Sequence, residues 1–324
     1  MANALRLSTR VAAVVALSLL AMGASRASDE NTHSRNFLFT YDMVITPPAS
    51  ARRVEAWIPV PSDLPGQDIG RVEVATDSDY KFTAEEVFGN RMVHLWADAP
   101  GGDAITATLT VEVTRREYSG SDGGRPNPRF LEPNRLVPTD GLIKRLSRRA
   151  TAGAEGDMAK ARAIYDYVTE TVSYDKSGNG WGRGDALFAC DAKAGNCTDF
   201  HALFIAMARA AGIPARFEIG FPLAADKDSG RVGGYHCWAE FYVEGRGWIP
   251  VDSSEAHKNP SRHDYYFGTL DPHRVEFTTG RDLVLEPPQK GEPLNYFVYP
   301  YIEVDGRPLK AKDRVKLEFS YKNV

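Results

Sequence analysis

The segment GNCTDFHALFIAMARAAGIPAR, residues 195–216, constrains the fold of this chain more than any other stretch. Asn196 is a good helix N-cap, Gly212 is typical of a helix end, and Pro214 prevents the helix from continuing. The apolar residues between these positions form one stripe and nearly fill the opposite side as well: Phe200, Leu203, Phe204 and Met207, then Ala202, Ile205 and Ala206. A helix that is apolar almost all round is buried at the centre of its domain.

The first turn of this helix carries a cysteine, Cys197. The unpaired N–H groups and the positive end of the helix dipole at that position favour the thiolate over the thiol. A cysteine placed in this way can have its pKa lowered from about 8.5 to roughly 3.5–7.5 when a base or cation is near. The same N–H groups can stabilise an oxyanion on an attacked carbonyl. The pattern is typical of a thiol nucleophile for acyl transfer.

A base and its orienting acceptor follow on two predicted strands. His236 lies in YHCWAEF and Asp252 ends GWIPVD, and residues 244–247, Glu-Gly-Arg-Gly, join the two strands as a short hairpin. This hairpin places His236 almost opposite Asp252, within a residue or so, where side chains share a face about 4.5–5.5 Å apart at Cβ. Asp252 is then expected to hold the His236 tautomer while the other ring nitrogen faces Cys197, a Cys–His–Asp arrangement.

These segments together resemble the bacterial transglutaminase-like superfamily, whose members are relatives of papain-type folds. The resemblance covers roughly residues 155–256 and rests on Gly, Cys, Asp, Leu-Phe and Gly-Ile-Pro-Ala-Arg, then His, Trp, Glu and Gly-Trp-x-x-x-Asp, in that order. It implies that Cys197 is the nucleophile, His236 the base and acid, and Asp252 the orienting carboxylate. The segment AWIPVPSD is also similar to the domain that precedes this core in such proteins.

Two positions depart from the family pattern. Cys237 follows the histidine where the family usually carries a small residue, and His201 occupies a position that is often small and apolar. His201 is interpreted as a packed helix histidine, because the gaps among Cys190, Cys197, His201, His236 and Cys237 do not follow the usual zinc-ligand spacings. No metal or other cofactor is therefore expected. Cys190 and Cys237 could pair as a disulfide, which would leave Cys197 free.

Two tryptophans are weak candidates for substrate binding. Trp181 lies in the glycine-rich stretch SGNGWGRGD, residues 177–185, and Trp238 follows Cys237. Both could line a substrate cleft, and the Trp181 indole could donate to the oxyanion, although tryptophans that flank such cores are as often packing residues. The glycine-rich stretch is interpreted as a loop that borders the site.

The chain is expected to have several parts. Residues 1–27 have the layout of a secretory signal peptide, with basic residues, an apolar run from Val11 to Ala24 and Ser-Arg-Ala before the cleavage point. Period-2 alternation over residues 34–118 predicts an antiparallel β-sandwich, and a Gly/Pro/Asn-rich linker follows over 119–140. An α+β core is expected over 141–275, in which the central buried helix packs on an antiparallel sheet. A β extension over 276–324 would close back onto the sandwich.

Composition limits the function classes. With 43% hydrophobic and 10% aromatic residues the chain can bury a core. Removal of the leader takes away three arginines and no acid, so the formal net charge goes from −4 to −7, which argues against nucleic acid as a partner. No second apolar run has membrane length. We expect a periplasmic or secreted protein that acts on a peptide or protein of the cell envelope.

The expected activity is thiol-dependent acyl transfer on amide bonds through an acyl-enzyme. Water as the second substrate would make the protein a peptidase or amidase, and an amine would make it a transferase, and the sequence does not choose between them. Two other function classes stay open: an inactive binding or scaffolding module on the same fold, and a zinc-binding protein. No Gly-x-Ser-x-Gly, His-Glu-x-x-His or Walker-type motif supports another catalytic class.

Overall fold

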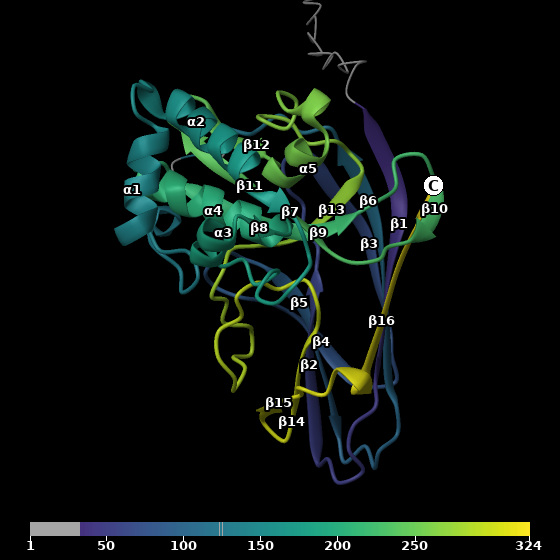
Figure 1. Ribbon diagram of the computed structural model, residues 1–324. Helices are drawn as coiled ribbons and strands as arrows, with labels where there is room; N and C mark the ends of the chain where they lie inside the picture. The colour runs from purple at the N-terminus through teal and green to yellow at the C-terminus, as the bar shows by residue number, and fades with distance from the viewer. Residues whose placement is uncertain (1–32, 123, 125) are drawn as a thin grey trace, which may run out of the picture. The chain divides into compact units, whose positions relative to one another are not determined.

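The computed structural model describes residues 33–122, 124 and 126–324, which fold into a two-sheet β region and a helix-covered four-stranded sheet (Figure 1). The predicted signal peptide, residues 1–27, lies outside these described residues. Within them, no helix is both long and apolar enough to cross a membrane.

The β region consists of two five-stranded sheets. The first has the order β10-β16-β1-β6-β3 and the second the order β15-β14-β2-β5-β4. Their strands are β1 (Ser34–Ile45), β2 (Arg53–Val60), β3 (Gln67–Ala75), β4 (Asp79–Ala84), β5 (Arg91–Asp98), β6 (Ile105–Arg116), β10 (Ser229–Arg231), β14 (Tyr301–Val304), β15 (Arg307–Pro308) and β16 (Val315–Asn323). Within the range predicted to alternate, 34–118, the stretches RRVEAWIPV, RMVHLWA and ITATLTVEVT correspond to β2, β5 and β6. Strands β1 and β6 bury alternate residues.

The end of the chain returns to its beginning. Strand β16 pairs antiparallel with β1 from Phe37↔Asn323 to Ile45↔Val315, and β14 pairs with β2. The predicted C-terminal β extension therefore supplies strands to both sheets of the β region. Strands β1 and β6 are long central strands with neighbours on both sides.

The core sheet has the order β12-β11-β9-β13. Its strands are β9 (Ala215–Pro222), β11 (His236–Val243), β12 (Gly247–Val251) and β13 (Arg274–Thr279), and all neighbours are antiparallel. Strand β13 spans the boundary expected between residues 275 and 276, so the core sheet extends past that point. A two-stranded parallel pair, β7 (Ser173–Tyr174) and β8 (Ala194–Gly195), lies beside the helices.

The α-helices cover one side of the core sheet (Figure 1). They are α1 (Gly141–Ala150), α2 (Gly156–Thr171), α3 (Ala186–Ala192), α4 (Cys197–Ala210) and α5 (Ser253–Lys258), with short 3-10 turns at Pro128–Leu131, Pro260–Arg262 and Lys312–Arg314. Every residue of α4 from Cys197 to Arg209 is buried, as its all-round apolar surface predicts. This central helix packs on β11 and β9, so the α+β fold class is confirmed.

The other side of the core sheet faces the β region through aromatic side chains. Phe39 of β1 stacks on Phe221 of β9 at a centroid distance of 5.2 Å and meets Phe277 of β13 edge-on at 5.5 Å. The Gln67 side chain accepts from the Glu276 N–H at 2.8 Å and donates to the Glu276 carbonyl at 3.0 Å. These contacts hold the core sheet against the β region, so the β region supports the sheet that carries His236.

The segment predicted as a linker is tied to the core sheet. Ser121 exchanges two backbone hydrogen bonds with Trp248 of β12, at 3.0 and 2.8 Å. Gly247 next to it has a φ of 78°, and the Ser121 carbonyl lies where a Cβ would have to go. Only glycine allows this close approach. The segment thus extends one edge of the core sheet.

Candidate active site

Cys197 lies at the N-terminus of α4, and this terminus is capped by neighbouring side chains. The Asn196 side chain accepts from the Thr198 N–H at 3.0 Å, and the Asp199 carboxylate accepts from the Asn196 N–H at 3.0 Å, which together form a capping box. Cys197 is the first residue of the helix and only 2% exposed. The N-cap sequence therefore fixes the thiol at the positive end of the helix dipole.

Asp199 also anchors the glycine-rich loop, residues 177–185, to the same helix start. Its carboxylate accepts from the Gly182 N–H at 2.7 Å and from the Gly184 N–H at 3.0 Å. The carboxylate is fully buried, and burial raises its pKa although these N–H donors oppose the rise. The loop that borders the thiol is therefore positioned by the helix itself.

His236 and Asp252 meet as predicted, through a different register. His236 Nε2 lies 2.7 Å from Asp252 Oδ2. In the hairpin, however, Ala239 is opposite Val251, so position 252 comes opposite Trp238 and the predicted register is off by two residues. Because Trp238 and His236 are two residues apart on one face of β11, the contact is the diagonal one, which long side chains can span.

Asp252 is held by an arginine that the sequence analysis missed. Arg274 of β13 donates to Asp252 Oδ2 at 2.9 Å and to Asp271 Oδ2 at 3.1 Å, while the Glu255 N–H donates to Asp252 Oδ1 at 3.0 Å. Asp252 is fully buried, which raises its pKa, but His236 and Arg274 outweigh burial and hold that pKa well below its usual range. No motif marks Arg274, because it comes from a strand that pairs on the far side of β9.

The buried thiol and imidazole stabilise each other as an ion pair. Burial alone would lower the pKa of His236, but the Asp252 carboxylate and a hydrogen bond with Cys197 raise it to about 10. With Nε2 bound to Asp252, Nδ1 is the ring nitrogen left for the sulfur. A hydrogen bond from Cys237, followed by that from His236, outweighs burial and puts the pKa of Cys197 well below its usual value. The pair is therefore thiolate and imidazolium near neutral pH.

His201, one turn further along α4, is a neutral packed histidine. Its Nδ1 lies 2.7 Å from the Cys197 carbonyl, and its Nε2 accepts from the Ser253 N–H at 3.1 Å. One donor and one acceptor satisfy the tautomer with the proton on Nδ1. Burial keeps its pKa below the ordinary value. His201 therefore links the first turn of α4 to the backbone that follows Asp252.

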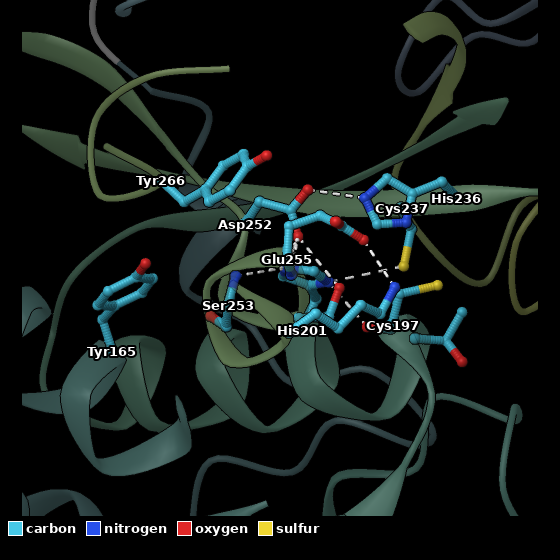
Figure 2. A network of polar contacts seen from close by, with 12 residues as sticks. Tyr165, Cys197, His201, His236, Cys237, Asp252, Ser253, Glu255 and Tyr266 are labelled. Carbon is cyan, nitrogen blue, oxygen red and sulfur yellow. Dashed lines mark hydrogen bonds and ion pairs between the residues drawn. The ribbon is translucent and has the colours of Figure 1, made fainter. Parts of the chain in front are cut away.

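Cys237 lies between these groups rather than near Cys190. Figure 2 shows Cys237 beside His236 on one strand, with its sulfur toward Cys197 and His201. The Cys237 sulfur is 3.6 Å from His201 Nδ1, and all three cysteines are free. Burial, followed by the bond that its S–H makes to Cys197, raises the pKa of Cys237 well above its usual value. Cys237 is thus a protonated donor to the thiolate, and Cys190 lies half-buried on α3.

Metal ligation has no support in this arrangement. Over the described ranges, 33–122, 124 and 126–324, no three His, Cys, Asp or Glu side chains are placed to hold a metal ion. Both nitrogens of His201 are already engaged by backbone groups, and His236 is engaged by Asp252.

The structure places neither predicted tryptophan on a cleft beside His236. Trp238 is fully buried, with the Arg274 guanidinium 5.0 Å from its ring, so a substrate has no access to it. Trp181 is half-buried in the glycine-rich loop, where the Lys176 amine lies 6.0 Å from its ring. Neither residue lines the cavity of about 380 Å³ that borders His236. The expectation for Trp238 is therefore corrected to a packing role under Arg274.

Comparison with known proteins places this chain beside one protein family. The sequence model of the transglutaminase-like superfamily matches residues 144–253, a range that contains Cys197, His236 and Asp252. The chain carries a transglutaminase-like domain. That superfamily is generally enzymatic, and the domain spans α2 to α4 and the strands β9, β11 and β12.

Relatives and a solved structure extend the likeness beyond this domain. An uncharacterized protein of Haemophilus influenzae is 28% identical over 365 positions, which cover 96% of this chain and 97% of that protein. The uncharacterized protein YebA of Bacillus subtilis is 25% identical over 171 positions, which cover 48% of this chain and 22% of YebA. The structure of a candidate cysteine protease from Cytophaga hutchinsonii has a TM-score of 0.62 at 17% identity and covers 90% of this chain and 98% of that one. At this identity the likeness establishes a shared fold.

Proposed function

We propose that the protein is a thiol-dependent acyl-transfer enzyme that acts on amide bonds of peptides or proteins. Cys197 is the nucleophile, His236 the general base and acid, and Asp252 the carboxylate that orients the imidazole. The observation that carries the proposal is the position of His236. Its Nε2 lies 2.7 Å from the Asp252 carboxylate, and it lowers the pKa of Cys197, which is the first residue of a capped helix.

The reaction begins with attack of the Cys197 thiolate on the carbonyl carbon of the substrate amide. The C–N bond then breaks, and the His236 imidazolium gives its proton to the departing amine. This leaves a thioester on Cys197 and a neutral imidazole. Neutral His236 next takes a proton from water or from a second amine as that molecule attacks the thioester, and the thiolate leaves. Asp252 stays ionised throughout and stabilises the imidazolium whenever it forms.

The oxyanion of the tetrahedral intermediate would form at the N-terminus of α4. The N–H groups of Thr198 and Asp199 there already donate to Asn196, whereas the N–H of Cys197 lies beside the reacting sulfur. A donor at this position, with the helix dipole behind it, is worth about 2.7–4 kcal/mol in well-studied acyl-transfer enzymes. Trp181 lies in the adjacent glycine-rich loop, with the Lys176 amine 6.0 Å from its ring.

The test combines thiol labelling with turnover. We expect iodoacetamide to modify Cys197 at neutral pH with an apparent pKa well below 8.5, and His236→Ala to slow this labelling. Cleavage of a peptide-amide pool, or incorporation of a labelled alkyl amine into it, separates a hydrolase from a transferase, with Cys197→Ala as the inactive control. The catalytic proposal would be wrong if labelling of Cys197 is slow, is unaffected by His236→Ala, and the peptide pool is not turned over. That result would favour an inactive binding module.

We also propose that the protein is exported, to the periplasm or the medium. The support is the leader-like arrangement of residues 1–27. Cell fractionation with N-terminal sequencing of the mature protein tests it, and a first residue of Ser28 is the expected result. Recovery of the full-length chain from the cytoplasm would contradict it.

A further inference from the structure

The cavity beside His236 gathers side chains from distant parts of the chain. It has a volume of about 380 Å³. Tyr235 and His236 of β11 form one part of it, and its rim comes from α5 and the segment after it, which contribute Glu255, Lys258 and Arg262. The cavity thus borders the imidazole that contacts the Asp252 carboxylate.

The carboxylates that line this cavity are already neutralised within it. Glu255 accepts from the Lys258 amine at 2.6 Å. Asp271 accepts from Arg274 at 3.1 Å and from the Tyr266 hydroxyl at 3.3 Å, and Arg274 holds its pKa at about 2 even though burial raises it. Each acid is therefore already paired with a cation of the cavity, and neither is free to bind a cation of the substrate.

Arg262 is the cationic residue of the cavity that takes no part in these ion pairs. Its guanidinium lies 4.1 Å from the centre of the Tyr265 ring and 4.7 Å from that of Tyr266, and Nη1 donates to the Tyr266 hydroxyl at 3.0 Å. Within the described part of the chain, no carboxylate forms an ion pair with Arg262. The two rings hold the guanidinium in place at the rim, so little side-chain freedom is lost when it binds an anion.

The remaining surface of the cavity suits the rest of an acidic side chain. The Lys258 amine, which is paired with Glu255, lies 4.0 Å from the centre of the Tyr174 ring at the same rim. Pro222, Leu223 and Ala225 provide the apolar lining. The Arg262 guanidinium is thus the cation of this cavity that no described carboxylate pairs with, in a chain whose formal net charge is −4.

We propose that this cavity is a subsite for a carboxylate of the substrate, with Arg262 as its specificity-determining residue. The proposal rests on the function proposed above and names the substrate class: an amide whose neighbouring residue carries an acidic side chain. The carboxylate pairs with the Arg262 guanidinium, with Lys258 near it, and the methylene groups pack on the apolar lining. A planar guanidinium with free N–H groups matches a carboxylate in geometry as well as charge.

Equilibrium binding to the full-length Cys197→Ala protein tests this subsite without any chemistry. The probes are two pools of short blocked peptide amides that differ only by Glu or Gln at one fixed position. We expect the Glu pool to bind about three- to fivefold more tightly, the size expected for one ion pair at an exposed arginine, and the preference to shrink between low and high salt. In the Cys197→Ala background, Arg262→Gln should remove the preference. Arg71→Gln, at an exposed arginine of β3, is the matched control and should keep it.

The outcomes separate this subsite from the proposed catalytic function. Equal binding of the two pools, no binding of either pool at millimolar concentration, or a Glu preference that survives Arg262→Gln would each overturn the subsite. Thiol labelling and turnover by the unaltered protein report on catalysis independently. If the Glu preference is present but labelling is slow and nothing turns over, the subsite stands and the catalytic proposal fails.

Discussion

Replacement of Cys237 by alanine isolates a contact that sets the reactivity of Cys197. Cys237 is fully buried, and it is the group that lowers the pKa of Cys197 most, as a donor to its sulfur. His201 Nδ1, 3.6 Å from the Cys237 sulfur, lies on its other side. The variant removes this donor while Cys197, His236 and Asp252 stay in place. We therefore expect a less stabilised thiolate and a higher pKa for Cys197.

The size of the effect follows from the strength of one hydrogen bond to a charged acceptor. Such bonds contribute about 1.5–3 kcal/mol, and a thiol is a weak donor, so the lower end applies. One pKa unit corresponds to about 1.4 kcal/mol, so Cys237→Ala should raise the pKa of Cys197 by about one unit. Loss of one buried sulfur atom should also cost about 1–2 kcal/mol of folding stability.

The measurement is the rate of iodoacetamide modification of Cys197 between pH 4 and pH 10, with mass mapping of the labelled peptide. Cys237→Ser should restore part of the low pKa, because a hydroxyl also donates. Cys190→Ala is the matched control, since Cys190 is half-buried on α3 and has no part in this network. If the Cys237→Ala profile coincides with that of the unaltered protein while its melting temperature is lower, the thiol is only a packing group and the reasoning is refuted.

Three further predictions concern the carboxylates of the site. Asp252→Asn should lower the pKa of His236 from about 10 and reduce turnover by about 10⁴-fold; an NMR titration of His236 and kcat measurements check it, and an unchanged titration would contradict it. Asp199→Ala should leave three backbone N–H groups without their acceptor and destabilise the fold by about 3 kcal/mol, a change that urea unfolding would detect or rule out. Asp271 has a pKa of about 2, below its value of about 3.9 in an unfolded chain, because Arg274 outweighs burial. The ionised Asp271 therefore contributes about 2 kcal/mol to the free energy of unfolding above pH 4, and this contribution is lost as the pH falls through 2. Urea unfolding at several pH values measures it. Asp271→Asn should make the free energy of unfolding fall less steeply between pH 4 and pH 2, and an equally steep fall would argue against the ion pair with Arg274.

Much of the fold was predictable because local patterns agree with tertiary packing. The all-round apolar helix became the buried α4, its N-cap and C-terminal glycine lie at the predicted ends, and the alternating stretches became β2, β5 and β6. The contact between His236 and Asp252 was also predicted, because a short hairpin restricts the register to a few choices. The predicted register was off by two residues, yet it kept the same face, since side chains alternate with period two.

The local sequence by itself determined the nucleophile's environment: an N-cap and a capping carboxylate, then a cysteine at the start of a helix that must be buried. It also determined that a histidine and an aspartate on neighbouring strands share one face. Only the tertiary structure decided what surrounds them. Arg274 reaches Asp252 because β13 pairs with β9, and Arg262 reaches the rim of the cavity because α5 folds back beside His236. Such contacts depend on which distant segments become neighbours, and neither periodicity nor spacing along the chain encodes that.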